Sequence, residues 1–322
     1  MTDLDQATVK PWVSFCISTY KRPDMLREQI KVILQQTFKD FEIVISDNDP
    51  ESDLSVMIEE FNDKRIRYSV NEENLGMVKS FNRSLQRARG EFVVMITDDD
   101  PVEQDFLSEM HRLFLLYPSY SVYAGFLRTG RKCKEVEIIN KANVFEEILN
   151  MNKTPSILWS SCIMKKEVVL SLGGMPDYGS PHLADHALIV MAGSESGVVV
   201  CNKMFSYIVK HNVNFSKFNF KMYVVGCEQF YILMSDFIKK NNMQQDALVA
   251  VKKHLSSWFI VSYFDLKRFY FKKRDANMLT ELESFKNEIF LFPFMQHVKG
   301  KYYLKNLIFT FKKYLLKPVI NA

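Results

Sequence analysis

The segment Glu91-Phe92-Val93-Val94-Met95-Ile96-Thr97-Asp98-Asp99-Asp100-Pro101 passes directly from apolar residues into three carboxylates. A short apolar, β-branched run that follows a glycine predicts a buried strand. Pro101 disfavours helical geometry at Asp100 and so ends the strand. We therefore expect the carboxylates at the carboxyl end of a core strand, where open α/β sheets bind their ligands.

Three adjacent carboxylates repel one another and are costly to bury unless a cation shares their site. Oxygen ligands on a short turn suit Mg²⁺ or Mn²⁺, and such an ion usually brings a phosphate group with it. A solvated acidic turn that caps the next helix is the alternative interpretation. This segment alone leaves both interpretations open.

Strand and helix patterns alternate before this segment. The predicted strands are 13–20, 41–46, 65–70 and 91–97, and the predicted helices are 25–36, 53–62 and 77–89. The alternation predicts an α/β fold with a parallel sheet and right-handed crossovers. The polar strand ends at 18–20, 47–49 and 98–100 then lie on one edge of the sheet and form a single crevice.

The composition is that of an ordinary globular protein, with 322 residues of which 47% are hydrophobic and 25% charged. Five scattered cysteines without a C-x-x-C pair are typical of reduced core cysteine in a cytoplasmic protein. The first ten residues carry no apolar signal region, and no apolar run is long enough for a membrane span.

The charge is unevenly distributed. Residues 221–322 contain 17 Lys and Arg against 8 Asp and Glu, which gives +9, and the remaining 25 basic and 30 acidic residues give −5. This asymmetry predicts a basic C-terminal part that meets an anionic partner. Nucleic acid and an anionic membrane both fit, but no nucleic-acid-binding motif accompanies the charge, so we expect no nucleic acid partner.

Five pieces of the sequence together resemble family 2 glycosyltransferases of the GT-A fold, whose Asp-rich signature is the DxD motif. They are Ser18-Thr19-Tyr20, Gln35-Gln36-Thr37-Phe38 with Phe41-Glu42, Ser46-Asp47-Asn48, Asn74-Leu75-Gly76 with Asn82, and Ala88-Arg89-Gly90-Glu91-Phe92 with Asp98-Asp99-Asp100. The resemblance is specific over residues 18–100, continues more loosely to about residue 216, and fades beyond. It implies a Rossmann-like GT-A domain over 1–220, with a nucleotide-sugar half at about 10–105 and an acceptor half at about 106–220. Residues 221–322 are expected to form a helical, basic, aromatic-rich extension.

The resemblance also implies which residues bind the nucleotide sugar. They are Ser18, Thr19, Tyr20, Arg22, Asp47, Asn48, Asn74, Gly76, Asp98, Lys210 and His211. Many family members have a second Asp where this chain has Asn48, and an amide can still pair with a uracil edge. The base therefore stays open, with UDP preferred, and a turn-forming Asx role is the alternative for Asp47.

The same alignment places the metal ligands and the catalytic base. Asp99 falls on the metal ligand and Asp100 on the adjoining acid, so the resemblance implies a divalent ion, Mg²⁺ or Mn²⁺. A strand near 157–166 and a helix that opens at 181–188 and ends near Gly193 supply the acceptor side. Asp185, near the start of that helix, matches the carboxylate that takes the acceptor proton. A helix-capping role is the alternative for Asp185.

The segment 300–317 predicts an amphipathic helix. At 100° per residue, its five lysines fall on one side and its leucines and aromatic residues on the other. Such a helix can lie in a membrane interface. It can equally dock on the protein by its apolar face with snorkelling lysines.

Together these features predict an inverting, metal-dependent glycosyltransferase that moves a sugar from a UDP-sugar to a saccharide acceptor. The acceptor could be lipid-linked, as in bacterial surface polysaccharide synthesis, with the protein in the cytoplasm or peripheral on the inner membrane face. Two other functions are open: a sugar nucleotidyltransferase, although the loop after Ser18-Thr19-Tyr20 lacks glycine, and a non-catalytic glycan-binding protein on a transferase fold.

Overall fold

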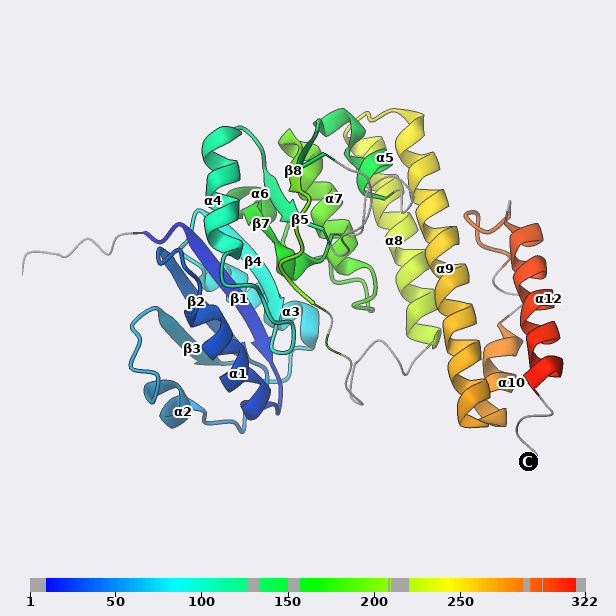
Figure 1. Cartoon of the computed structure of the whole chain (residues 1–322), viewed down its shortest axis with the longest axis horizontal. Coiled ribbons are helices and arrows are strands. Elements are labelled where there is room, and N and C mark those ends of the chain that lie inside the picture. The colour runs from blue at the N-terminus through cyan, green and yellow to red at the C-terminus, as the bar shows by residue number, and fades with distance from the viewer. Residues whose placement is uncertain are drawn as a thin grey trace, which may run out of the picture. The chain divides into compact units, whose positions relative to one another are not determined.

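The computed structural model describes residues 10–126, 134–149, 157–207, 209, 220–285, 290–296 and 298–316, with side chains up to residue 311. The chain divides into two compact units, Met1–Asn214 and Phe215–Ala322. Figure 1 shows the strands in the first unit and the long helices of the second.

In the described residues, the first unit contains an eight-stranded sheet in the order β3-β2-β1-β4-β7-β5-β8-β6. Its strands are β1 (Val13–Thr19), β2 (Phe41–Asp47), β3 (Ile66–Val70), β4 (Phe92–Thr97), β5 (Val122–Gly125), β6 (Val136–Ile139), β7 (Cys162–Lys165) and β8 (Val198–Cys201). Strands β1 to β4 are mutually parallel, and β5 is parallel to β8. Strand β7 is antiparallel to β4 and β5, and β6 is antiparallel to β8. The predicted α/β class is confirmed, with a mostly parallel central sheet.

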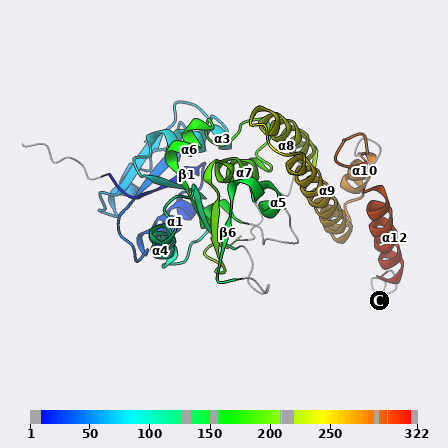
Figure 2. The same ribbon diagram turned by 90° about the horizontal axis from the view of Figure 1, so that it is seen from above.

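Helices cover both faces of this sheet. They are α1 (Pro23–Leu34), α2 (Ser55–Glu59), α3 (Met77–Arg87), α4 (Phe106–Leu116), α5 (Val144–Ile148), α6 (Lys166–Ser171) and α7 (Ala184–Ser196), with 3₁₀ turns η1 (Lys141–Asn143) and η2 (Trp159–Ser161). Helices α1 and α4 lie on one face, and α3, α6 and α7 lie on the other (Figures 1 and 2).

The core follows the two periodicities of the sequence. Alternate residues of β1, namely Val13, Phe15 and Ile17, are fully buried and point to one face of the sheet. Leu26 and Ile30 of α1, spaced by one helical turn, pack into the same cluster.

Two predicted elements differ from the structure. The segment 157–166, expected as one strand, is the 3₁₀ turn η2 followed by the short strand β7. The helix expected from 181 to about 193 begins at Ala184 and ends at Ser196. Gly197, with φ of +106°, ends it, because this left-handed conformation stops a helix and suits only glycine well.

The second unit is helical in its described residues. Its helices are α8 (Phe220–Lys240), α9 (Gln245–Lys273), α10 (Ala276–Ser284) and α12 (Lys299–Leu316). Helices α8 and α9 lie side by side (Figures 1 and 2), and their buried core includes Phe230 and Leu255. None of the described helices is both long and apolar enough to cross a bilayer.

The four cysteines that the structure describes, Cys16, Cys162, Cys201 and Cys227, are buried and free. Cys133 lies outside the described residues. Burial raises the pKa of the Cys16 thiol to about 12, as expected for unreactive core cysteine.

Candidate functional site

The registers of the parallel strands bring the predicted polar strand ends together. Thr19 lies opposite Asp47, and Ser18 lies opposite both Ser46 and Thr97. The residues that follow β1, β2 and β4 therefore meet at one edge of the sheet. This is the predicted position of the crevice, at the carboxyl ends of the central strands.

The acidic residues after β4 form a partly buried cluster with an arginine. Asp98 is only 4% exposed, and its carboxylate accepts a hydrogen bond of 2.8 Å from Thr19 Oγ1. Arg22 Nη1 lies 3.1 Å from Asp98 Oδ1 and 3.4 Å from Asp99 Oδ2. A solvated acidic turn would leave these carboxylates in water, so this geometry favours the other interpretation, a structured acidic site.

Burial shifts the pKa of two of these carboxyls. Loss of water raises the pKa of Asp98, and the charge of Arg22 opposes the shift. Burial and the charge of Asp99 together raise the pKa of Asp100 to about 6, against hydrogen bonds that include those from Ser160 and Trp159. The cluster therefore carries more negative charge than its surroundings compensate, which is the condition under which a cation binds favourably.

The donor set suits a hard divalent cation, because Asp99 and Asp100 are consecutive residues that both carry carboxylate oxygens. In the described residues, no group of three or more His, Cys, Asp or Glu side chains is placed to hold a metal ion by itself. A magnesium ion in a nucleotide site typically takes one or two carboxylates together with substrate phosphates and water. Asp99 and Asp100 fit that mode of binding, and their metal role stays a prediction.

An amide network lies beside the cluster, at the ends of β2 and β3. Asn48 Nδ2 donates to Asn74 Oδ1 at 2.8 Å, and Asn48 Oδ1 accepts from the Leu75 backbone N–H at 2.9 Å and from Asn71 Nδ2 at 3.2 Å. Asn74 also accepts from the N–H of Gly76 at 3.0 Å, and Gly76, with φ of +79°, is the N-cap of α3. The predicted residues Asn48, Asn74 and Gly76 are thus held together as one rigid loop.

Asp47 makes the contacts that its alternative interpretation predicts. One carboxylate oxygen accepts from Tyr68 Oη at 2.8 Å, and the other accepts from the Asp49 N–H at 3.1 Å, as in an Asx turn. Both oxygens of Asp47 therefore have protein partners. A direct contact of Asp47 with a nucleotide base stays a prediction.

The side chains predicted to line the base pocket differ in exposure. Ser18 donates to Ser80 Oγ at 2.8 Å and belongs to the buried sheet edge. Tyr20 is 43% exposed, so its ring is free to stack on an incoming base. The predicted Lys210 and His211 lie outside the described residues.

The predicted base, Asp185, lies in the first turn of α7 and is partly exposed. Burial, and to a lesser degree the charge of Asp185, raise the pKa of Cys162, the first residue of β7. Burial lowers the pKa of His182, and the charge of Asp185 opposes that shift. Turn η2 joins the two regions, because Cys162 directly follows it and its Trp159 and Ser160 interact with Asp100. Leu183, just before α7, is buried with φ of +66°, a strained conformation of the kind found at functional sites.

A second anchor positions the loop that leads towards α7. Asn82 of α3 donates to the Met175 carbonyl at 2.8 Å and accepts from the Met175 N–H at 2.8 Å. This reciprocal pair of hydrogen bonds ties the Gly173-Gly174-Met175 loop to α3.

The sequence reasoning missed several residues of this site. Asn71 and Tyr68 contact the predicted residues from β3 and its end, and Gln29 Nε2 donates to the Asp100 carbonyl at 2.9 Å. Asn71 directly follows a predicted parallel strand, so the strand-end argument used for Asp98 could have found it. Gln29 carries no such signal, since it is one polar residue in an amphipathic helix.

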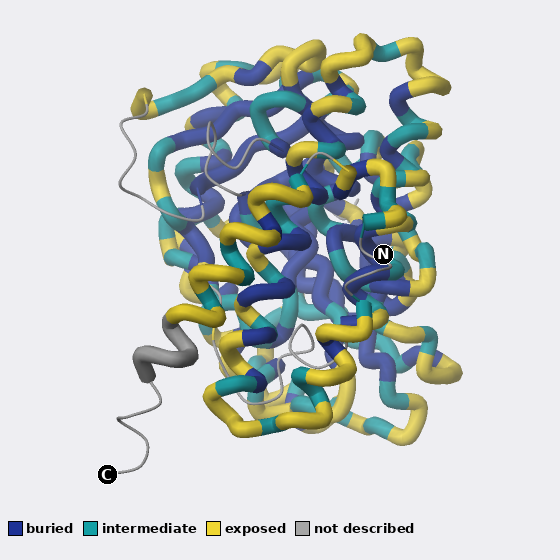
Figure 3. The backbone as a smooth tube through the Cα atoms, turned by 90° about the vertical axis from the view of Figure 1, so that its right-hand side faces the viewer, coloured by how far each residue is buried: buried dark blue, intermediate teal, exposed yellow. Residues whose placement is uncertain are grey.

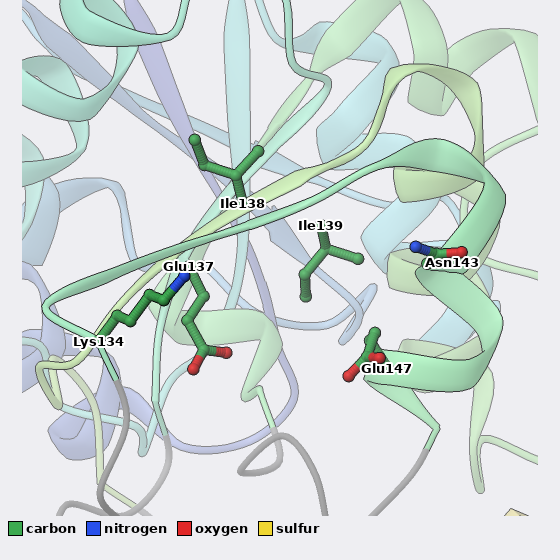
Figure 4. Close-up of a pocket in the computed structure, with 6 residues that line it drawn as sticks. All are labelled: Lys134, Glu137, Ile138, Ile139, Asn143 and Glu147. Atoms are coloured by element: carbon green, nitrogen blue, oxygen red, sulfur yellow. The ribbon is translucent and has the colours of Figure 1, made fainter.

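A separate pocket of about 210 Å³ lies beside β6, the outermost strand on one side of the sheet (Figure 4). Its lining residues come from the segment around β6 and from η1 and α5: Lys134, Glu137, Ile138, Ile139, Asn143 and Glu147. None of the predicted site residues lines it. Strands β7, β5 and β8 separate β6 from β4, so this pocket is not part of the acidic crevice.

Comparisons with known proteins agree with this geometry. The model of the family Glycosyl transferase family 2 matches residues 14–170. An uncharacterized glycosyltransferase of Methanocaldococcus jannaschii, MJ1057, is 39% identical over 175 residues, which are 49% of this chain and 58% of that protein. A GalNAc(5)-diNAcBac-PP-undecaprenol β-1,3-glucosyltransferase of Campylobacter jejuni is 34% identical over 103 residues, 31% of this chain and 33% of that protein. The chain thus matches less than two thirds of each of these relatives.

Two solved structures share the fold. Staphylococcus aureus TarS 1-349 in complex with UDP-GlcNAc has a TM-score of 0.56 at 16% identity, covering 84% of this chain and 79% of that one. The mannosyltransferase PcManGT of Pyrobaculum calidifontis, in complex with GDP-Man and Mn²⁺, has a TM-score of 0.56 at 17% identity, covering 93% and 88%. Residues 14–170, which hold the acidic cluster and the amide network, are therefore a glycosyl transferase family 2 domain.

Proposed function

We propose that this chain is an inverting, metal-dependent glycosyltransferase that moves a sugar from a nucleotide diphosphate to a saccharide hydroxyl. The observation that carries the proposal is the cluster of Thr19, Arg22, Asp98 and Asp99 at the ends of parallel strands. The family 2 match over the same residues supports it.

The donor is proposed to be a UDP-sugar bound along the crevice. The buried Asn48 amide is engaged by Asn74, Leu75 and Asn71, so it would hold their loop beside the base. Tyr20 is exposed enough to stack on the base ring. Asp98, held by Thr19, would accept from the ribose. Arg22 already lies between two carboxylates, and its guanidinium would turn to the diphosphate once a donor is bound.

Asp99 and Asp100 are proposed to hold a divalent ion, Mg²⁺ or Mn²⁺. When bound, such an ion supplies positive charge against the diphosphate as it departs from the sugar. The chain's contribution is to hold the two carboxylates in place: Gln29 fixes the Asp100 backbone, and Arg22 contacts Asp99.

Asp185 is the proposed general base. It would take the proton from the acceptor hydroxyl as that oxygen attacks the sugar carbon, on the face opposite the departing diphosphate. Attack on that face inverts the anomeric centre. The amino end of α7 favours a carboxylate in its first turn, which suits this role.

The acceptor is proposed to be a lipid-linked saccharide in bacterial surface polysaccharide synthesis. The name of the Campylobacter jejuni relative includes a diphosphoundecaprenol saccharide, which supports this choice. Such an acceptor would require the protein to work in the cytoplasm, at the inner face of the cell membrane.

The test is the melting temperature of the purified protein with UDP, GDP, ADP and CDP, each with and without Mn²⁺. A ligand that binds only the folded state raises the melting temperature with the logarithm of its saturation. We expect one diphosphate, UDP, to raise it only in the presence of Mn²⁺, and Asp99→Ala to abolish the rise. Asp40→Ala, at an exposed position before β2, is the control and should keep the rise.

If no nucleotide shifts the transition with or without metal, the transferase proposal is wrong. A non-catalytic glycan-binding protein on a transferase fold then explains the chain better.

A further inference from the structure

Helix α12 is attached to α9 through one narrow face. Tyr302 is 1% exposed, and its ring centroid lies 5.5 Å from that of Tyr263. Asn306 accepts a hydrogen bond of 2.9 Å from Lys267, and the Lys267 ammonium lies 5.1 Å from the centre of the Phe309 ring. Since Tyr302, Asn306 and Phe309 follow one another at helical spacing, they define the attached face of α12.

Lys267 fixes the rotation of α12 about its own axis. It is only 6% exposed and also pairs with Glu283 of α10 at 2.8 Å. If α12 rotated, the Lys267 ammonium would stay buried and keep Glu283, but it would lose its contacts with Asn306 and Phe309. Rotation of the helix is therefore unfavourable, and the side opposite Tyr302 is held outward.

That opposite side is apolar and exposed. Tyr303, Leu304, Leu307, Ile308 and Phe311 are 51%, 59%, 66%, 47% and 66% exposed, and they form what we call the outer face of α12. Figure 3 shows exposed stretches recurring along the helix that runs into the C-terminal segment. The apolar face of the predicted amphipathic helix is therefore not the face that attaches α12 to the rest of the protein.

More apolar surface continues beside the start of the outer face. The Phe290 ring lies 6.0 Å from that of Tyr303, and the next residue, Leu291, is 77% exposed. A contiguous apolar patch of this kind marks an interaction site more often than scattered exposed leucines do.

The charge of α12 identifies the partner. The helix contains five lysines and no acidic residue. At 100° per residue, Lys301, Lys305 and Lys312 fall along one border of the outer face. Burial, together with the charges of Lys301 and Arg268, lowers the pKa of Lys305, and the charge of Asp265 opposes this shift.

We infer that the outer face of α12 docks on an anionic phospholipid surface, with its apolar side chains at the acyl boundary and its lysine border among the headgroups. This inference rests on the proposed function for its purpose, because a lipid-linked acceptor lies at such a surface. The physical evidence for it is the exposure and charge of α12 and its neighbouring residues, and its test needs neither a sugar donor nor a metal ion.

The experiment is co-flotation of the full chain with vesicles, either of neutral phosphatidylcholine or of phosphatidylcholine with 30% phosphatidylglycerol. We expect binding to the anionic vesicles at low salt and at least tenfold weaker binding to the neutral ones. Leu307→Gln with Phe311→Gln should weaken anionic binding at least tenfold. Lys301→Gln with Lys312→Gln should weaken it several-fold and reduce its dependence on salt.

The matched control is Leu115→Gln with Leu116→Gln, two leucines that are 65% and 57% exposed at the end of α4. This variant should bind vesicles as the wild type does. Circular dichroism and melting curves of all variants test whether they are folded. We expect them to be folded because the side chains of Leu115, Leu116, Lys301, Leu307 and Phe311 are exposed.

Three outcomes overturn the inference: no flotation with anionic vesicles at low salt, equal flotation with neutral vesicles, or unchanged flotation of the Leu307/Phe311 variant. If that variant instead loses self-association in sedimentation, the outer face meets a second copy of the chain and the membrane inference is wrong. Vesicle binding without any nucleotide-dependent stabilisation would leave this inference standing while the proposed transferase function fails.

Discussion

At the residue scale, the buried carboxyl of Asp100 lowers the stability of the folded protein when it is ionised. Burial and Asp99 raise its folded pKa to about 6, from 3.8. Between these two values the folded state binds more protons than the unfolded state, so the contribution of Asp100 to stability falls as the pH rises. Above pH 6 the ionised carboxylate therefore opposes folding, by up to about 3 kcal/mol for a shift of this size.

We predict that Asp100→Asn stabilises the metal-free protein at pH 7.5, because the amide carries no charge to desolvate. The expected gain in the free energy of unfolding is about 1–3 kcal/mol. It should shrink as the pH falls through 6 and vanish near pH 4, where the wild-type carboxyl is protonated in both states. Urea unfolding in EDTA at pH 7.5, 6, 5 and 4 measures this.

Asp53 offers the contrasting control for that series. Its carboxyl is exposed, and hydrogen bonds from Ser55 lower its pKa, so it contributes stability above its unfolded pKa and loses it as the pH falls. Asp53→Asn should therefore destabilise slightly at pH 7.5 and have no effect near pH 3. A loss of stability in Asp100→Asn at pH 7.5 would show that its hydrogen bonds outweigh its desolvation.

At the scale of elements, the loop before α7 depends on two adjacent glycines that differ in one respect. Gly173 and Gly174 have φ of +84° and +85°. A Cβ on Gly173 would meet nothing within 4 Å, whereas one on Gly174 would lie 2.4 Å from Asn82 Oδ1. Gly174 is therefore required twice, by its conformation and by the Asn82–Met175 anchor.

We predict that Gly174→Ala destabilises the protein more than Gly173→Ala does. Each alanine adopts a left-handed conformation at a cost of about 1–2 kcal/mol. Gly174→Ala also displaces Asn82 from Met175 and loses about 1–2 kcal/mol more in hydrogen bonds. Urea unfolding of the two variants measures the difference, and equal losses would mean that Asn82 moves aside without cost.

The elements that the sequence predicted well are those whose signal is local. Strands β1 to β4 are apolar runs with polar ends, so their existence and their common edge followed from pattern alone. Strand β7 was predicted too long, because Trp159-Ser160-Ser161 lies within a mostly apolar run, yet it forms a 3₁₀ turn whose Trp159 and Ser160 interact with Asp100. The salt bridges of Arg22 were equally beyond reach, since they join residues 76 and 77 positions apart.

The whole molecule combines two units with different cores and opposite charge. The first has a sheet covered by helices, and the second has a helical core around Phe230, Leu255 and Phe259. Residues 221–322 carry +9 by sequence and the rest carry −5. The proposed donor site belongs wholly to the first unit and the outer face of α12 to the second, so each function can be perturbed separately.

We therefore predict two calorimetric transitions for the full chain, since each unit has its own buried core. UDP with Mn²⁺ at a hundred times its dissociation constant should stabilise the first unit by about 2.7 kcal/mol. For a unit of this size, that gain corresponds to a rise of roughly 5–10 °C in one transition, with the other unchanged. Gly174→Ala assigns the transitions, because it should lower only the one that UDP raises. A single transition that moves as a whole with UDP would instead show that the two units unfold cooperatively, and binding at the crevice would then be coupled energetically to the helical unit that carries α12.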